Sequence, residues 1–359
     1  MIYFYPHRYL RDRQLDTIRQ WPQRDVLNPI ITNRMGGQVD AESAGGVKKI
    51  RSWKKLLPLL NVKLRPKGLP AGAVVYVWGG LVSTGKFIVD LDTPWAMVGY
   101  NLRAMPLYRR VIRYLLLSER CLGIRCMSMS CRESLGQLFG EKVYRKAELH
   151  YPKIPQFVTK NVNNTLKLCR FLFVGTQFEI KGGISLLKAF QRVYARRKGE
   201  CQLDVVTHLP AKLEPAVKKC NGINLYAAEF TRGEIYSRFM KKADVLILPT
   251  FVESFGMVAL EALAHGLAII ATDVYALGEM VENGKNGCLL KPPISIWDGV
   301  MPSKTYYNLS SIKNELSRTD ARYFESELEV EIERFIDEPE WRNRAKQASV
   351  DLMRQRFSC

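Results

Sequence analysis

The sequence lacks an apolar run long enough to cross a membrane. Its most apolar stretches, residues 71–82 and 105–117, are broken by Gly, Pro or Arg well short of the roughly 20 residues that a bilayer span requires. It also lacks a secretory signal, because the short apolar run Met1–Tyr5 is followed at once by Pro, His and Arg. We therefore expect a cytoplasmic protein with no membrane-spanning helix.

Metal-binding patterns are missing as well. The 8 cysteines include no C-x-x-C pair and have no histidine at zinc-binding spacing, and the 4 histidines form no cluster of ligands. We interpret the cysteines as reduced thiols, mostly buried. The sequence therefore predicts no metal site and no bound cofactor.

Acidic residues are scarce in one half of the chain. The 359 residues include 54 Lys and Arg against 35 Asp and Glu, a net charge of +19, and 47% are apolar, which is enough for two ordinary domains. Residues 1–160 hold 27 basic and 11 acidic side chains, a net charge of +16, whereas residues 161–359 carry only +3. Such an excess favours a polyanionic partner: nucleic acid, an anionic membrane surface or a phosphorylated substrate. A generic solubilising surface is the alternative.

Two basic segments carry much of this charge. Residues 48–67 mix cations with Trp and Leu, and residues 103–120 have the pattern of an amphipathic helix with Leu107, Val111 and Leu115 on one face. Such a helix suits an anionic bilayer surface, although an ordinary helix covering the core has the same pattern. The residues that we assign to a membrane or acceptor surface are Lys48, Lys49, Lys54, Lys55, Arg109, Arg110 and Arg113.

The apolar runs predict an α/β fold. In the first half, runs such as Ile2–Tyr5, Val74–Trp78 and Phe87–Val89 alternate with helical stretches, which favours parallel strands. A polar, proline-containing stretch around residues 152–165 is the best candidate for a linker. We therefore expect a basic N-terminal domain over residues 1–160 and a C-terminal domain over residues 161–359.

The second half alternates more regularly. Strands are expected over residues 168–174, 202–207, 223–226, 245–248 and 268–271, and helices over 184–197, 232–242, 257–264 and 277–282. Strict βαβ alternation with short connections predicts a doubly wound, Rossmann-like domain, which binds ligands beyond the carboxyl ends of its strands. The pattern fails over residues 291–322 and returns as helices over 326–336 and 340–356.

A glycine-rich segment with one lysine connects a predicted strand to a helix. It runs from Phe173 to Gly183 and contains Gly175, Lys181 and Gly182. A cation beside the positive end of a helix dipole is unfavourable unless something anionic lies near it. Glycines that let N–H groups approach, together with a lysine, form a phosphate cradle. The Gly-Lys-Ser/Thr order of a Walker loop is absent, and a solvated loop is the alternative.

Two glutamates accompany the next predicted helix. Glu253 precedes this helix, where the helix dipole alone is sufficient to explain an acid. Glu261 lies within Met257–Ala264, which is apolar on nearly every face, so its carboxylate requires hydrogen-bond donors. A ribose diol supplies two donors, as in dinucleotide-binding folds, and a buried Arg or Lys is the competing explanation.

Together these features resemble the donor-binding half of glycosyltransferase family 4. The ordered set comprises Phe173–Gly183, Ala243–Thr250, Glu253-x7-Glu261 running into Gly266, Ala271–Asp273, Glu279 and Asn283–Gly287. The resemblance implies an α/β protein of the GT-B fold, with two Rossmann-like domains facing each other across a cleft. It also implies a retaining enzyme that uses a nucleoside diphosphate sugar, with an acceptor-binding, membrane-facing domain over residues 1–160 and a donor-binding domain over residues 161–359.

The resemblance implies a role for each matching residue. Lys181 would hold the donor diphosphate, Glu253 would contact the transferred sugar, and Glu261 would bind the ribose. The donor-binding residues expected in this way are Gly175, Thr176, Lys181, Gly182, Glu253, Ser254, Phe255, Gly256, Met257, Val258 and Glu261.

The sequence departs from the family in two places. Relatives often carry a second cation where this chain has Thr176–Gln177, so diphosphate binding would need the helix terminus or a cation such as Arg232. Many relatives carry an active-site histidine where this chain has Asp92, and we expect Asp92, Lys181 and Glu253 to be the catalytic residues. The Asp-Leu-Asp that ends at Asp92 mimics a metal-binding motif of another fold, but family 4 enzymes generally need no divalent metal.

The function expected from these features is transfer of a sugar to an acceptor hydroxyl with retention of configuration. The expected partners are the nucleotide-sugar donor, a lipid-linked or otherwise anionic glycan in polysaccharide or lipopolysaccharide assembly, and the inner face of the membrane. No nucleic acid is expected, because no nucleic-acid-binding motif is present. A sugar-nucleotide epimerase of the same fold, a non-catalytic nucleotide-sugar-binding protein and a nucleic-acid-binding module are the alternatives.

Overall fold

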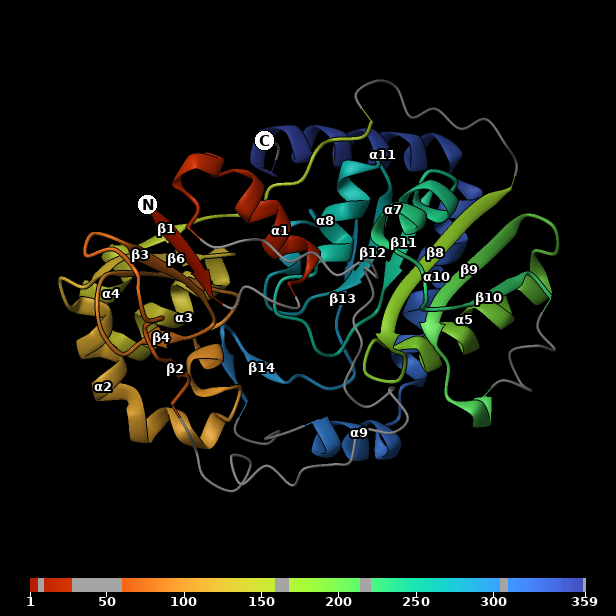
Figure 1. The fold of residues 1–359 in the computed structure, drawn as a ribbon. Coiled ribbons are helices and arrows are strands. Elements are labelled where there is room, and N and C mark those ends of the chain that lie inside the picture. The colour runs from red at the N-terminus through yellow and green to blue at the C-terminus, as the bar shows by residue number, and fades with distance from the viewer. Residues whose placement is uncertain (6–9, 28–59, 159–167, 214–220, 304–308, 358–359) are drawn as a thin grey trace. The chain divides into compact units, whose positions relative to one another are not determined.

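The computed structural model describes residues 1–5, 10–27, 60–158, 168–213, 221–303 and 309–357. They form two compact units, which are drawn with their elements labelled in Figure 1. Unit 1 comprises Met1–Pro152 and a stretch that begins at Gly299, and unit 2 comprises Lys153–Asp298 and the chain from Leu309 onward. The chain therefore enters unit 2 before residue 160, and the sequence did not predict the return to unit 1 at Gly299.

Unit 1 contains a parallel sheet with the strand order β1-β3-β5-β6-β7. Its described strands follow one another across the sheet in chain order. The strands of the unit are β1 (Ile2–Tyr5), β2 (Val62–Lys63), β3 (Val74–Trp78), β4 (Leu81–Val82), β5 (Phe87–Leu91), β6 (Cys121–Cys126), β7 (Ala147–Leu149) and β15 (Met301–Pro302). Its helices are α1 (Asp12–Arg19), α2 (Met105–Leu117), α3 (Met129–Phe139) and α4 (Glu141–Lys146).

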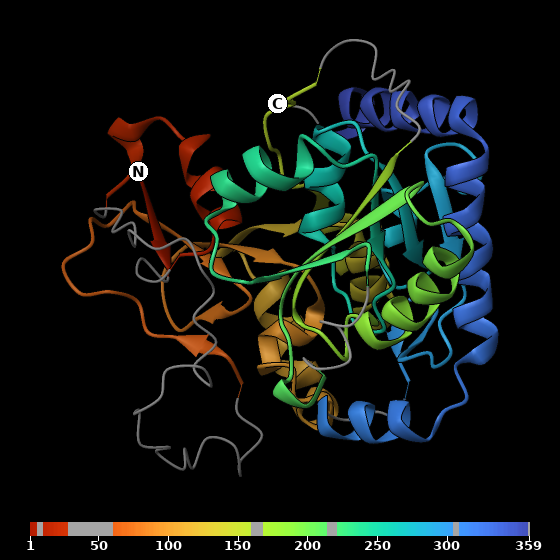
Figure 2. The same ribbon diagram turned by 90° about the vertical axis from the view of Figure 1, so that its right-hand side faces the viewer.

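Unit 2 contains a second parallel sheet with the strand order β10-β9-β8-β11-β12-β13. Helix α10 packs along α5, as Figure 2 shows. The strands of the unit are β8 (Cys169–Gln177), β9 (Cys201–His208), β10 (Ile223–Ala227), β11 (Val245–Leu248), β12 (Ala268–Thr272), β13 (Gly287–Leu290) and β14 (Trp297–Asp298). Its helices are α5 (Gly183–Arg196), α7 (Arg232–Ile235), α8 (Met257–Ala264), α9 (Leu309–Arg318), α10 (Arg322–Asp337) and α11 (Pro339–Leu352).

The strand order of unit 2 reverses between β8 and β11. The chain runs outward from β8 through β9 to β10, returns to the other side of β8, and runs outward again from β11 to β13. The loops that follow β8 and β11 therefore leave the sheet in opposite directions. Open α/β sheets bind ligands at the carboxyl ends of the strands at such a switch point.

The core of unit 2 surrounds the strands beside this switch point. Every residue of β11 and β12 is buried, as expected for central strands of a parallel sheet covered on both faces. Helix α8, which is apolar apart from Glu261, packs against both strands. A buried ion pair fastens α11 to the start of β11: Lys346 Nζ lies 2.8 Å from Asp244 Oδ1, and the two side chains are 6% and 1% exposed.

The core of unit 1 contains a charged residue within the sheet. Phe4, Tyr76 and Trp78 form a buried aromatic cluster over β1 and β3. Asp90 of β5 lies beside it, with Oδ1 2.8 Å from Arg13 Nη1 of α1 and with Oδ2 accepting a 2.6 Å hydrogen bond from the Tyr76 hydroxyl. Because the carboxylate is paired and hydrogen-bonded on both oxygens, the sheet tolerates its burial.

Some elements differ from those expected. The helix predicted over residues 277–282 is a single turn, Leu277–Glu279, because the N–H of Glu282 donates to Asn286 Oδ1 at 2.7 Å instead of continuing a helical ladder. Helix α9 lies in the segment where the sequence pattern failed. No helix among the described residues combines the length and the apolar character that crossing a membrane requires.

Candidate functional site

Two loops meet at the switch point of unit 2. The first, residues 178–182, connects β8 to α5, and the second, residues 249–256, connects β11 to α8. The N–H of Phe251 in the second loop donates to the carbonyl of Ile180 in the first at 3.0 Å. The glycine-rich segment and the first glutamate, which the sequence suggested separately, therefore share one edge of the sheet.

An ion pair occupies this edge. Lys181 Nζ lies 2.7 Å from Glu253 Oε2 and donates to the carbonyl of Val252 at 2.9 Å. The other carboxylate oxygen, Glu253 Oε1, accepts the N–H of Ser254 at 3.2 Å. The Lys181 and Glu253 side chains are 19% and 15% exposed, so the pair is largely desolvated but still reachable. The sequence assigned these residues to different parts of a ligand, and the structure brings them into direct contact.

The two loops also pack tightly against each other at Gly182. This residue has φ +75°, in the left-handed region that favours glycine, and a Cβ there would lie 2.0 Å from the carbonyl oxygen of Pro249. Gly175 and Thr176 end β8 beside it, and a Cβ on Gly175 would lie 3.3 Å from Lys181 Cγ. A larger residue at Gly182 would therefore push the loops apart and displace the lysine.

The N-terminus of α8 opens onto the same edge. Its N-cap is Gly256, with φ +95°, and no side chain caps the first-turn N–H groups. Uncapped N–H groups at the positive end of a helix can bind an anion. Of the other residues predicted here, Phe255 is buried, and Met257 and Val258 in the first turn are partly exposed.

Glu261 is also ion-paired. Arg232 Nε of α7 lies 2.9 Å from Glu261 Oε1, with the side chains 17% and 14% exposed, and the same nitrogen contacts the Tyr236 hydroxyl. Burial raises the pKa of Tyr236, and the Glu261 carboxylate raises this pKa further, so the phenol stays protonated. The sequence left a ribose and a buried cation open as partners of Glu261, and Arg232 is a cation in that position.

Aromatic rings pack around the C-terminal end of α8. His265, the C-cap residue, stacks on Phe157 with 4.5 Å between ring centroids, and its Nδ1 lies 2.7 Å from the carbonyl oxygen of Glu261. Burial lowers the pKa of His265, which favours the neutral imidazole. The N–H of Phe157 donates to the carbonyl of Ala264 at 2.9 Å. The first residues of unit 2 are thus fastened to the helix that carries Glu261.

In unit 1, Asp92 follows β5 at the carboxyl edge of the sheet. Its carboxylate accepts hydrogen bonds from the Tyr100 hydroxyl, at 2.8 and 3.0 Å, and from the N–H of Thr93 at 2.8 Å. Both oxygens of Asp90, by contrast, are engaged by an arginine and a tyrosine inside the unit. Among the described residues, no group of three or more His, Cys, Asp or Glu could hold a metal ion.

The basic residues predicted for a membrane or acceptor surface differ in their environments. Arg109 and Arg113 of α2 donate to the carbonyls of Leu138 and Phe139, so these two side chains cap the end of α3. Arg110 is exposed. The four predicted lysines lie outside the described residues: Lys48, Lys49, Lys54 and Lys55.

Helix α2 also turns apolar side chains away from the core. Leu107, Val111 and Tyr114 succeed one another at helical spacing and are 67%, 48% and 74% exposed. The sequence grouped the first two with Leu115 on one apolar face. The side of α2 that faces the core is formed instead by Met105, Ile112 and Leu116.

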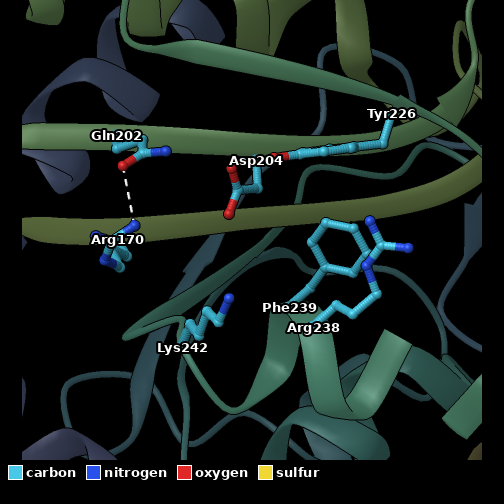
Figure 3. Close-up of a pocket in the computed structure, with 7 residues that line it drawn as sticks. All are labelled: Arg170, Gln202, Asp204, Tyr226, Arg238, Phe239 and Lys242. Carbon is cyan, nitrogen blue, oxygen red and sulfur yellow. Dashed lines mark hydrogen bonds between the residues drawn. The ribbon is translucent and has the colours of Figure 1, made fainter. Parts of the chain in front are cut away.

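A separate pocket of about 170 Å³ lies near the amino ends of β8 and β9 (Figure 3). In it, Arg170 donates to Gln202 at 2.9 Å, and Asp204, Arg238 and Lys242 provide further charged groups. This pocket is at the end of β8 opposite Gly175, so it takes no part in the arrangement around Lys181.

The segment that holds these loops matches a known family. Residues 169–297 match the model of the glycosyl transferases group 1, to which this segment of the chain is similar. The D-inositol 3-phosphate glycosyltransferase of Paenarthrobacter aurescens is 33% identical over 129 residues, which are 34% of this chain and 25% of that protein. A glycogen synthase of Mycobacterium tuberculosis is 42% identical over 53 residues, 15% of this chain and 13% of that protein. The match thus spans a quarter of these relatives' length or less.

Solved structures extend the likeness in fold to both units. WaaG, a glycosyltransferase involved in lipopolysaccharide biosynthesis, matches with a TM-score of 0.56 at 14% identity, over 97% of this chain and 94% of that chain. HepE of Anabaena in complex with UDP matches with a TM-score of 0.54 at 12% identity, over 79% of this chain and 74% of that chain. The expected GT-B fold class, with two parallel α/β sheets, is confirmed.

Proposed function

We propose that this protein is a retaining glycosyltransferase that moves a sugar from a nucleoside diphosphate sugar to an acceptor hydroxyl. In this proposal Lys181 and the N-terminus of α8 bind the diphosphate, Glu253 binds the transferred sugar, and Glu261 binds the ribose. The match of residues 169–297 to the glycosyl transferases group 1 supports it. The UDP bound by HepE, a protein of similar fold, is consistent with a diphosphate donor.

The observation that carries the proposal is the Lys181–Glu253 pair beside the uncapped N-terminus of α8. A departing diphosphate gains negative charge as the bond to the sugar breaks. Positive charge that is already fixed at that position stabilises the transition state more than the ground state. The carboxylate beside it can accept hydrogen bonds from sugar hydroxyls and orient the sugar for attack.

Asp92 is proposed as the catalytic or sugar-contacting group on the acceptor side. It lies at the carboxyl edge of the unit 1 sheet, and its partners there are one hydroxyl and one main-chain N–H. A carboxylate bound in this way can also accept a hydrogen bond from an acceptor hydroxyl.

We further propose that the acceptor is a lipid-linked or otherwise anionic glycan, and that unit 1 docks on the anionic inner face of a membrane. Leu107, Val111 and Tyr114 offer apolar contact on α2, and Arg110 is exposed on the same helix. Each cation near an anionic leaflet contributes about 1 kcal/mol. The excess positive charge of residues 1–160 adds to this attraction.

Thermal unfolding with and without nucleoside diphosphates tests the donor part. UDP, GDP and ADP are compared, since a ligand at 100 times its Kd stabilises the folded protein by about 2.7 kcal/mol. Lys181→Met is expected to reduce the shift, because it weakens diphosphate binding. Release of nucleoside diphosphate that depends on an added acceptor distinguishes a transferase from an epimerase. If no diphosphate stabilises the protein, the proposed function is wrong.

Flotation with vesicles tests the membrane part. Wild type is expected to float with anionic but not with neutral vesicles, and less at high salt. The triple variant Leu107→Gln/Val111→Gln/Tyr114→Gln is expected to stay in solution. Its matched control is Tyr323→Gln/Val330→Gln, which changes exposed residues of α10 in unit 2. A wild type that remains in solution with anionic vesicles at low salt would contradict the docking surface.

A further inference from the structure

We infer that Arg232 is a second cation for the donor diphosphate, and that Glu261 holds it in position before the donor binds. The assignment rests on the proposed donor site and adds a residue from a different helix to it. Arg232 begins α7, whereas Lys181 and the other proposed diphosphate groups lie in the loops and in α8.

Both glutamates of Glu253-x7-Glu261 hold a cation in the same manner. Lys181 Nζ lies 2.7 Å from Glu253, and Arg232 Nε lies 2.9 Å from Glu261. All four side chains are between 14% and 19% exposed. The candidate donor site thus contains two matched carboxylate–cation pairs, one whose glutamate precedes α8 and one whose glutamate lies in the second turn of α8.

Charge favours a second cation. The diphosphate of a nucleotide sugar is doubly charged, whereas the site offers the Lys181 ammonium, which shares its charge with Glu253, and the equivalent of about half a charge at a helix N-terminus. Arg232 adds a second cationic group, which shares its charge with Glu261, and its guanidinium suits phosphate oxygens through its planar array of donors.

The position of the Arg232–Glu261 pair is suitable for contact with a diphosphate at the N-terminus of α8. Glu261 is four residues beyond Met257, so both residues lie on one face of α8. Helical side chains lean toward the helix N-terminus, so the Glu261 carboxylate and the guanidinium bound to it lie on the side that leads to the uncapped N–H groups. Tyr236 restrains the guanidinium further, since its ring centroid is 5.3 Å from the guanidinium carbon.

A purely structural ion pair in the same unit looks different. The Lys346–Asp244 pair is closed off, with side chains 6% and 1% exposed. The Arg232 and Glu261 side chains are 17% and 14% exposed, close to the values for Lys181 and Glu253. Arg232 is therefore reachable by a ligand to the same degree as the lysine.

Calorimetric titration of the full chain with UDP and with uridine tests the inference, with GDP and guanosine, and ADP and adenosine, in parallel. Arg232→Gln is expected to lower diphosphate affinity about tenfold to a hundredfold and to leave nucleoside affinity within about twofold. Arg232→Lys should keep most of the diphosphate affinity because it keeps the charge. Arg238→Gln, in the helical turn that follows α7, is the matched control and should change neither affinity.

The possible results distinguish a wrong role for Arg232 from a wrong proposed function. Equal losses of diphosphate and nucleoside affinity in Arg232→Gln would show that Arg232 only supports Glu261, and unchanged affinities would show that it takes no part. The double variant Arg232→Gln/Glu261→Gln leaves no unpaired charge, so it should fold and still show a reduced preference for diphosphate over nucleoside. If wild type binds none of the three diphosphates, the proposed function itself fails.

Discussion

The two units contain the same kind of parallel sheet but place their charged residues differently. In unit 2, β11 and β12 are wholly buried and contain no charged residue, and the ion pairs of Lys181 and Arg232 lie beyond the strand ends, partly exposed. In unit 1, Asp90 lies inside β5, 2% exposed, and is held by Arg13. Carboxylate–cation pairs thus border a candidate ligand site in unit 2, whereas the pair of Asp90 fastens α1 to the sheet of unit 1, as the Lys346–Asp244 pair fastens α11 within unit 2.

Strand order provides the physical reason. In unit 2 the strand order reverses between β8 and β11, and the polar groups of the candidate site lie in the two loops that follow these strands. The described strands of unit 1 follow chain order, and a helix residue reaches the middle of β5. The surroundings of a charged residue, more than its type, therefore decide its role.

The largest expected effect comes from breaking the buried pair of unit 1. Arg13→Met leaves Asp90 as an uncompensated buried charge and should lower the free energy of unfolding by about 3–5 kcal/mol. Urea denaturation measures it, and Lys346→Met, which breaks the buried pair of unit 2, should have an effect of similar size. If Lys181→Met proved equally destabilising, the distinction between buried and edge pairs would be lost.

The next effect is on binding. Lys181→Met should weaken binding of a nucleoside diphosphate by about 1.5–3 kcal/mol, because it removes hydrogen bonding to a charged group. It should lower the free energy of unfolding less than Arg13→Met does, because Glu253 is more exposed than Asp90. Calorimetric titration and urea denaturation of the same preparation measure the two quantities. A large loss of stability with unchanged binding would assign Lys181 to the structural class of Arg13.

A third variant tests whether Asp92, unlike the buried Asp90 two residues before it, takes part in the reaction. Asp92→Asn keeps the shape of the side chain and removes its charge, so folding and donor affinity should persist while transfer falls about tenfold, the loss of one hydrogen bond to a charged group. Transfer of a radiolabelled sugar measures the rate. Repeating the assay with a chelator tests the expectation that the reaction needs no divalent metal ion. Unchanged transfer would leave Asp92 as the structural end of β5.

The smallest effect concerns the ion pairs between α5 and α10. Burial acts to raise the pKa of Glu329, but hydrogen bonds from Arg196 and Arg192 outweigh it and hold the pKa below its usual value. Stability from this group is therefore present above its unfolded pKa of about 4.3 and is lost as pH falls through the lower, folded value. Glu329→Gln should cost about 0.2–1 kcal/mol at pH 7. Urea denaturation at several pH values should show the difference disappearing in acid.

The sequence was sufficient to predict most of the strands and helices of unit 2. β11 and α8 have the predicted bounds, because a short, wholly apolar run and a helix flanked by two glycines leave little choice of conformation. Gly182 and Lys181 could be placed at a loop between strand and helix for the same reason. The ends of elements carry strong local signals, and the candidate donor residues lie at such ends.

The sequence was insufficient to predict contacts between segments that are distant along the chain. Arg232 could be placed at the start of a helix, but only the packing of α7 beside α8 brings it to Glu261. Helix α2 has apolar residues on two sides, and tertiary packing alone decided that Ile112 faces the core and Leu107 faces outward. No local pattern signalled the return of the chain to unit 1 at Gly299.

The divided path of unit 2 along the chain affects how the protein is made. Asp244, at the start of β11, is synthesised 102 residues before Lys346, its buried partner in α11. At about 5–20 residues per second, the ribosome needs roughly 5–20 s to supply that cation. During this interval the central sheet must either stay open at that end or keep Asp244 in contact with water. The last helices therefore decide when the nascent domain can close around its central strands.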